Sequence, residues 1–177
     1  HSLRRRQRQM CIRDRYYTGM RIGELQALTL ADLDLENGII HINKTYAIIS
    51  GQEIITTPKT TKSVREIYIP AFLCKLLKKH IKRYYKPQPD TRVFQMAKET
   101  YRNRLVNHSE KAGVKRIRLH DIRHSHASLL IDLNFSVLMI SERLGHEDPS
   151  ITLKTYAHLF PTKQNELVER LDEIFNK

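Results

Sequence analysis

The β-branched residues of this chain are gathered in one stretch, and this clustering limits the folds that the chain can adopt. Three segments, IIHINKTYAII, QEIITTPK and SVREIYIP, lie between residues 39 and 70 and are separated by Ser50-Gly51 and by a Lys/Thr turn. Residues of this type favour strands, and short turns favour antiparallel pairing of neighbouring strands. The stretch therefore predicts a small antiparallel sheet of about three strands.

Apolar residues recur at helical spacing on both sides of this stretch. The expected helices run from Met20 to about Leu35, from Pro70 to Lys86, from about Ala97 to Ala112, over residues 119–133, from Ser136 to Gly145, from about Ser150 to Leu159, and over a C-terminal stretch that holds Leu167, Val168, Leu171, Ile174 and Phe175. Ser136 is a suitable N-cap and Gly145 a suitable terminator for the helix between them. The sequence thus predicts an α+β fold that is mainly α-helical.

The charge of the chain indicates a polyanionic partner. Among 177 residues, 31 Lys and Arg stand against 19 Asp and Glu, which gives a formal net charge of +12. Nucleic acid and an anionic membrane surface are the usual partners of such a surplus. No apolar run approaches the ~20 residues that span a bilayer, so nucleic acid is the favoured partner.

Residues 1–15 differ in composition from residues 16–177. The first segment holds six Arg and one Asp in an aperiodic string, which leaves twenty-five basic and eighteen acidic residues, a surplus of +7, in the rest. We therefore expect a basic tail outside the core, followed by one domain over residues 16–177. The two cysteines, Cys11 and Cys74, have no C-x-x-C spacing, which favours a reducing, intracellular and cytoplasmic setting.

Several strongly polar side chains stand where a core does not require them, and their types suit a phosphodiester substrate. Paired guanidinium groups fit the charge of a phosphoryl transition state. A tyrosine hydroxyl can be the covalent nucleophile, with a histidine taking its proton and a lysine protonating the departing sugar oxygen. These cationic side chains then supply the positive charge that a metal ion supplies in other phosphoryl-transfer sites. The residues concerned are Arg21, Arg123, His120, His146, Lys59 and Tyr156, with Glu24 three residues after the first arginine.

Some of these residues also have a purely structural interpretation. Arg21 with Glu24 fits an ordinary surface ion pair at helical spacing. Lys59 lies in a lysine-rich turn, where a solvated side chain is expected. Tyr156 is one of eight tyrosines, most of which should be half buried.

The histidines of residues 119–133 allow two further interpretations. His126 lies on the apolar stripe of this helix and fits a core histidine. His120, His124 and His126 together suggest a metal site, since the first two are one turn apart. No HExxH glutamate or Cys/His pairing supports this second interpretation.

Four segments carry a resemblance to a known family. They are TGMRIGELQALTLADLDL at residues 18–35, TPKTTKSVREIYIP at 57–70, LHDIRHSHAS at 119–128 and LGHEDPSITLKTYAH at 144–158. Box by box, they resemble the first arginine box, the lysine-bearing β-hairpin, the His-x-x-Arg box and the tyrosine box of the tyrosine recombinases, the phage-integrase family. The order and approximate spacing also match, and the resemblance covers about residues 16–177.

The resemblance implies a role for each matching residue. Tyr156 would attack the scissile phosphate, form a 3′-phosphotyrosyl link and release a 5′-hydroxyl. The link conserves phosphodiester energy, so strand exchange would need no ATP, metal or other cofactor. The remaining implied roles are phosphate clamps for Arg21 and Arg123, assistance to proton transfer at the tyrosine for His120, a hydrogen bond to the phosphate for His146, general acid for Lys59 and support of the active site for Glu24.

The resemblance also implies an architecture and partners. We expect the tyrosine-recombinase catalytic-domain fold with a small three-stranded antiparallel sheet, acting on double-stranded DNA as a homo-oligomer, a tetramer. In this family the C-terminal helix commonly docks into a neighbouring subunit; the alternative is that Leu167, Leu171 and Phe175 pack on their own domain. Residues 1–15 look foreign to the family, and we expect this chain to be a catalytic domain that lacks the N-terminal core-binding domain of family integrases.

The function expected from these observations is site-specific DNA recombination by the integrase of a phage or an integrative mobile element. Two alternatives stay open. The same residues can relax DNA in the manner of a type IB topoisomerase, by cutting one strand and resealing it. Without a domain that clamps the DNA from its other side, the chain can also be a DNA-binding fragment with no useful catalysis.

Overall fold

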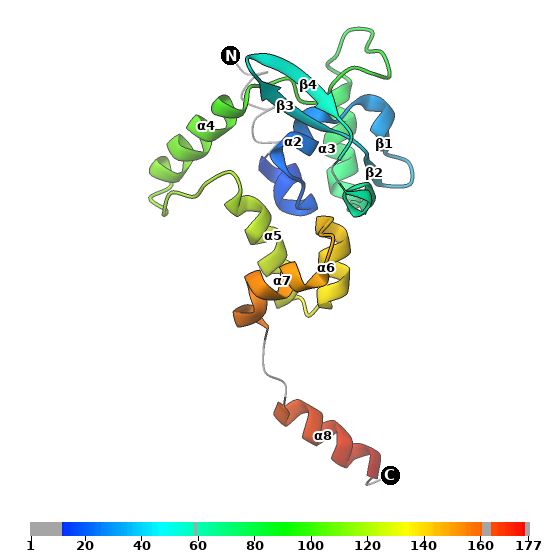
Figure 1. The fold of residues 1–177 in the computed structure, drawn as a ribbon, viewed down its shortest axis with the longest axis vertical. Coiled ribbons are helices and arrows are strands. Elements are labelled where there is room, and N and C mark those ends of the chain that lie inside the picture. The colour runs from blue at the N-terminus through cyan, green and yellow to red at the C-terminus, as the bar shows by residue number, and fades with distance from the viewer. Residues whose placement is uncertain (1–11, 59, 161–163, 176–177) are drawn as a thin grey trace.

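The computed structural model describes residues 12–58, 60–160 and 164–175. Figure 1 shows two groups of elements, one built around the strands with α2, α3 and α4, and the other made of α5, α6 and α7, with α8 apart at the C-terminal end. Residues 12–18 are helical, and the helices that follow are α2 (Ile22–Ala27), α3 (Ala71–Ile81), α4 (Lys98–Lys111), α5 (Asp121–Asp132), α6 (Val137–Leu144), α7 (Pro149–Tyr156) and α8 (Gln164–Phe175), with 3-10 turns at Leu30–Asp32, Thr61–Ser63 and Ala157–Leu159.

The strands are distributed over two sheets. Strands β1 (Leu33–Asp34), β2 (Ile39–Ile42) and β5 (Arg65–Tyr68) form an antiparallel sheet in the order β1-β2-β5, and β3 (Thr45–Ile49) pairs with β4 (Gln52–Thr56) in a separate hairpin. The expected small antiparallel sheet is therefore confirmed, but its expected membership is wrong. The segment IIHINKTYAII is two strands, because Asn43 and Lys44 both donate hydrogen bonds to the buried Asp32 and turn the chain there.

The first expected helix is shorter than its apolar pattern predicted. It ends at Ala27, and Thr29 has an extended backbone. The backbone N–H and the hydroxyl of Thr29 both donate to Asp32 Oδ2 at 2.7 Å, which starts a 3-10 turn with a capping box. Residues 33–34 then pair with β2 instead of continuing a helix.

The later helices agree more closely with expectation. Ser136 caps α6 by accepting a hydrogen bond from the N–H of Met139, and Gly145 ends it with φ at 67°. Helix α3, however, ends at Ile81 rather than at Lys86. The reason is local: the Tyr84 hydroxyl donates to the carbonyl of Val93 at 2.6 Å, which folds the chain back on itself.

Two apolar cores hold these elements. The larger one lies among α2, α3, α4 and the three-stranded sheet and includes Leu25, Ile40, Ile67 and Leu73. The smaller one joins α5, α6 and α7 through Ala127, Ile131, Ile140, Leu144 and Tyr156. A candidate catalytic residue, Tyr156, is thus also a core residue of the second group.

The structure differs from the expected domain start at residue 16. Residues 12–18 are helical, Asp14 and Arg15 are buried, and Ile12 packs against the larger core together with Tyr16. The Nε of Arg15 donates to the carbonyl of Met20 at 3.2 Å. The run of arginines conceals the i, i+4 spacing of Ile12 and Tyr16, which places one apolar face on this short helix. Residues 12–15 therefore belong to the folded domain.

No helix within the described ranges is long and apolar enough to cross a membrane.

Candidate active site

One cavity of about 590 Å³ gathers the candidate residues that the structure describes. It opens between the start of α2, the segment before β5, and helices α5 and α7. Lys59 lies outside the described residues, while its neighbours Pro58 and Thr60 line the cavity. The candidate residues in the lining are Arg21, Glu24, His120, Arg123, His146 and Tyr156.

Glu24 anchors Arg21 at the start of α2. The Nη1 of Arg21 donates to Glu24 Oε1 at 2.9 Å, and the backbone N–H of Arg21 donates to Oε2 at 2.8 Å. The Nη2 of Arg21 also donates to the carbonyl of Gly145 at 3.2 Å. Glu24 is buried while the Arg21 side chain is 39% exposed, so the interpretation as a surface pair is wrong for the carboxylate.

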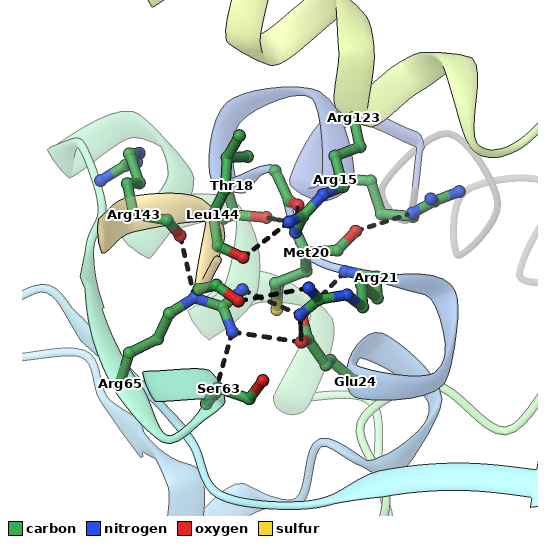
Figure 2. Close-up of polar contacts among 12 residues, drawn as sticks. Arg15, Thr18, Met20, Arg21, Glu24, Ser63, Arg65, Arg123, Arg143 and Leu144 are labelled. Carbon is green, nitrogen blue, oxygen red and sulfur yellow. Dashed lines mark hydrogen bonds and ion pairs between the residues drawn. The ribbon is translucent and has the colours of Figure 1, made fainter. Parts of the chain in front are cut away.

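Arg65, which the sequence analysis did not single out, is the second partner of Glu24. Its Nη1 and Nη2 donate to Oε1 and Oε2 at 3.1 and 3.0 Å, and its Nε donates to the carbonyl of Arg143 at 2.8 Å (Figure 2). Burial would raise the pKa of Glu24, but the hydrogen bonds and charge of Arg65, with the charge of Arg21, hold it below its ordinary value. The sequence did contain a signal of this role, because Arg65 lies two residues before Ile67 and so shares the inward face of β5 with it.

Arg123 is fixed by two backbone carbonyls. Its Nη1 donates to Gly19 at 2.8 Å and its Nη2 to Leu144 at 2.7 Å, and the side chain is buried. Burial and then the neighbouring Arg21 lower the pKa of Arg123 to about 9. Gly19 has φ at 69°, and a Cβ there would lie 2.6 Å from the ring of His126, so only glycine fits this turn.

His146 follows the left-handed Gly145 at the end of α6. Its Nδ1 lies 2.8 Å from the hydroxyl of the fully buried Thr152 on α7. Burial, followed by the charges of Arg123 and Arg21, lowers the pKa of His146 to about 4. The imidazole is therefore neutral at pH 7 in the free protein.

Tyr156 ends α7 and is 4% exposed. Its hydroxyl lies 2.6 Å from Nδ1 of His124 on α5. Burial raises the pKa of Tyr156, and the charge of Arg123 offsets this only in part. The sequence analysis considered His124 only as a metal ligand, although its position one turn after His120 was the signal that both face one site.

The other two histidines of α5 differ in their surroundings. His120, the N-cap residue, is exposed, and its ring meets the edge of the His124 ring at 4.8 Å between centroids. Burial, His124 and Arg123 lower its pKa. His126 is buried and its Nε2 accepts a hydrogen bond from Nε of Arg143 at 3.0 Å, which confirms the core interpretation.

The expected metal alternative has no support in the geometry of these histidines. His124 and His126 are committed to Tyr156 and Arg143 respectively. Within residues 12–58, 60–160 and 164–175, no three His, Cys, Asp or Glu side chains form a group suited to a metal ion.

Comparisons with known proteins agree with this geometry. The family model described as "Phage integrase family" matches residues 2–163. The chain is 34% identical over 172 residues to the ICEBs1 integrase of Bacillus subtilis (strain 168), covering 90% of this chain and 47% of that protein. It is 34% identical over 174 residues to the integrase of Staphylococcus phage L54a, covering 89% and 49%. The chain thus spans about half the length of these relatives.

Solved structures share the fold. The Tn1549 transposon integrase in complex with transposon right end DNA superposes with a TM-score of 0.73 at 22% identity, covering 95% of this chain and 58% of that one. The catalytic domain of bacteriophage HP1 integrase gives a TM-score of 0.62 at 23% identity, covering 94% and 83%. This chain therefore belongs to the phage integrase family and has the fold of a tyrosine recombinase catalytic domain.

Proposed function

We propose that this chain cleaves and rejoins DNA strands in site-specific recombination, as the catalytic domain of the integrase of a phage or an integrative mobile element. The observation that carries the proposal is the convergence of two arginines, three histidines and a tyrosine on one cavity. Membership of the phage integrase family and the likeness to the ICEBs1 and phage L54a integrases support it.

The arginine side of the cavity suits a phosphate. Burial and then the charge of Arg21 lower the pKa of Arg123, and an anion between the two guanidinium groups would relieve the repulsion between them. Each guanidinium carries five N–H groups, so those not bonded to Glu24 or to backbone carbonyls remain for non-bridging oxygens. Neutral His146 would add one hydrogen bond to the same phosphate.

The tyrosine side suits nucleophilic attack. The Tyr156 oxygen would form a bond to phosphorus, the bond to the 5′-oxygen would break, and a 3′-phosphotyrosyl link would result. Lys59 would protonate the departing 5′-oxygen, and His120 would assist proton transfer at the tyrosine. Attack by a 5′-hydroxyl on the link would reverse the step, so exchange would require no ATP.

The partners proposed are double-stranded DNA and further copies of this chain, four on the DNA, in a cytoplasmic setting. Helix α8 lies apart from α5, α6 and α7 in Figure 1, and its Val168, Leu171 and Ile174 side chains are exposed. An exposed apolar stripe of this kind supports docking onto a second copy. The variant Leu171→Asp should therefore leave strand cleavage intact and weaken assembly on DNA, measured by native gel shift.

A suicide-substrate assay tests the proposed reaction. The chain is incubated with a pool of nicked duplexes of varied sequence, and covalent protein–DNA adducts are counted on denaturing gels. Wild-type protein should give an adduct that Tyr156→Phe abolishes and that EDTA leaves unchanged. The matched control is Tyr85→Phe, because Tyr85 is 88% exposed and is not among the residues that line the cavity.

Three results would overturn or redirect this proposal. Equal results from wild type and Tyr156→Phe would end the catalytic interpretation and leave a DNA-binding fragment. An adduct without sequence preference, together with relaxation of supercoiled plasmid, would favour a topoisomerase. Loss of the adduct in EDTA would favour a metal site at the histidines.

A further inference from the structure

The shortest contact of the Tyr156 hydroxyl is made to a histidine outside the expected catalytic set. Nδ1 of His124 lies 2.6 Å from the hydroxyl oxygen, a short hydrogen bond between α5 and α7. The rings meet edge to face with their centroids 5.6 Å apart. Both residues line the cavity that holds Arg21 and Arg123.

The surrounding packing holds this pair in place. The Tyr156 ring belongs to the smaller core with Ala127 and Ile131 of α5, so tyrosine and histidine are joined through their own helices. The His124 ring also contacts the His120 ring in a T-shaped arrangement, with their centroids 4.8 Å apart. The short contact is therefore built into the packing of two helices and does not depend on loose side chains.

The position of His124 beside the Tyr156 hydroxyl matters for the proposed reaction. A tyrosine that attacks phosphorus must lose its proton, and the group that takes it has to lie within hydrogen-bond reach of the oxygen. His124 meets this requirement through Nδ1. His120 stands one helical turn earlier, exposed at the N-cap, and contacts the ring of His124.

We infer that Nδ1 of His124 is the immediate proton acceptor of Tyr156 during strand cleavage, an inference that rests on the proposed function. As the bond from the Tyr156 oxygen to phosphorus forms, its O–H bond breaks and an N–H bond forms at Nδ1, while the bond from phosphorus to the 5′-oxygen breaks and that oxygen takes a proton from Lys59. In rejoining, the 5′-hydroxyl attacks, and the imidazolium of His124 returns its proton to the departing phenolate. His120 is then a positioning residue that acts on the His124 ring.

The direction of the hydrogen bond tests this inference without any DNA. To accept the phenol proton, His124 must carry its own proton on Nε2 and leave Nδ1 unprotonated. Nitrogen-15 chemical shifts of the 177-residue chain, with His124→Gln used to assign the signals, should report this tautomer at pH 7.5. A proton found on Nδ1 would make His124 a donor to Tyr156 and overturn the inference.

Kinetics separate a proton acceptor from a residue that only orients the tyrosine. In His124→Asn the amide oxygen replaces Nδ1 as a hydrogen-bond acceptor but is a very weak base. Loss of a general base costs about 10²- to 10⁴-fold, so His124→Asn should slow cleavage and rejoining by at least about 100-fold. Cleavage by His124→Asn within about threefold of wild type would show an orienting role only, and would overturn the inference.

A more acidic nucleophile provides the specific readout. Trifluorotyrosine at position 156 ionises more readily than tyrosine and depends less on a base. It should restore cleavage by His124→Asn at least about tenfold while changing the wild-type rate little, as expected when a base is lost. The matched control is His120→Asn, where trifluorotyrosine should restore much less; equal restoration in both variants would assign the proton to His120.

The two proposals fail in different ways. If wild type and Tyr156→Phe form adducts equally, the proposed function fails, while the tautomer of His124 still decides whether Nδ1 can accept a proton from Tyr156. If Tyr156→Phe abolishes the adduct and His124→Asn does not slow it, the proposed function stands and this inference is wrong.

Discussion

The two sides of the cavity are built on different principles. On the side of α2 and β5, the buried Glu24 accepts hydrogen bonds from Arg21 and Arg65, and the guanidinium of Arg123, a residue of α5, is held by the backbone carbonyls of Gly19 and Leu144. On the side of α5 and α7, the Tyr156 hydroxyl has its contact with the half-buried His124. The arginine side is a network in which removing one member leaves buried partners unpaired. The tyrosine side depends on one hydrogen bond, so changes there should alter chemistry more than folding.

The largest effect is expected from Arg123→Lys. A lysine keeps one charge but cannot hold both the Gly19 and Leu144 carbonyls and a phosphate as a planar fork does. Adduct formation should fall about 10²- to 10³-fold, and stability by about 1–3 kcal/mol for a carbonyl left unpaired. The control is Arg102→Lys on the exposed face of α4, which should change neither. Cleavage by Arg123→Lys within tenfold of wild type would contradict the assigned clamp.

Glu24→Gln should destabilise the protein while leaving the shape of the site almost unchanged. The amide leaves Arg65, which is almost fully buried, without its opposite charge. Breaking a buried ion pair on one side costs about 3–5 kcal/mol. Glu53→Gln is a matched control, because the Glu53 side chain, which pairs with Arg92, is 63% exposed. Urea unfolding should separate the two variants clearly, and equal midpoints would show that the network contributes nothing to folding.

The free energy of unfolding measured below pH 7 should show that two histidines are held neutral in the folded protein. Burial lowers the pKa of His126 and of His146 to about 4, each from an ordinary value of 6.5. Between these two pH values the unfolded chain binds more protons than the folded protein does. The free energy of unfolding should therefore fall as pH falls from about 6.5 to about 4. Urea unfolding at pH 7, 5.5 and 4.5 measures this slope. His146→Asn should reduce it, and an unchanged slope would mean that His146 is not held neutral.

The smallest effect is expected from Thr152→Val. The valine keeps the volume of the buried threonine and removes the hydroxyl that contacts Nδ1 of His146. Loss of such an orienting hydrogen bond should slow cleavage about tenfold, a small share of what a transition-state donor supplies. Thr100→Val on α4, which is not among the residues that line the cavity, is the control and should cleave at the wild-type rate. Equal cleavage rates for the two variants would show that the contact with Thr152 does not contribute to the role of His146 in cleavage.

Sequence reasoning found the residues that face the cavity better than the residues that support them. Arg21, Arg123, His146 and Tyr156 stand in motifs of fixed spacing, so a resemblance could locate them. Arg65 could not be found in that way, because its role depends on the pairing of β5 with β2, which brings it under α2.

The same limit explains the errors in the fold. Helical spacing predicted α6 and its cap closely, because Ser136 and Gly145 act through local backbone geometry. The break of the first helix at Thr29 depends on the buried Asp32, whose partners Asn43 and Lys44 lie between β2 and β3. Apolar periodicity carries no information about such long-range polar contacts.

In the proposed reaction, Tyr156 carries the DNA strand through its hydroxyl. The most direct measurement is tandem mass spectrometry of the adduct after nuclease and protease digestion. We expect a nucleotide joined through its 3′-phosphate to the peptide that contains Tyr156, and no such peptide from Tyr156→Phe. A nucleotide on any other residue, or one joined through its 5′-phosphate, would contradict it.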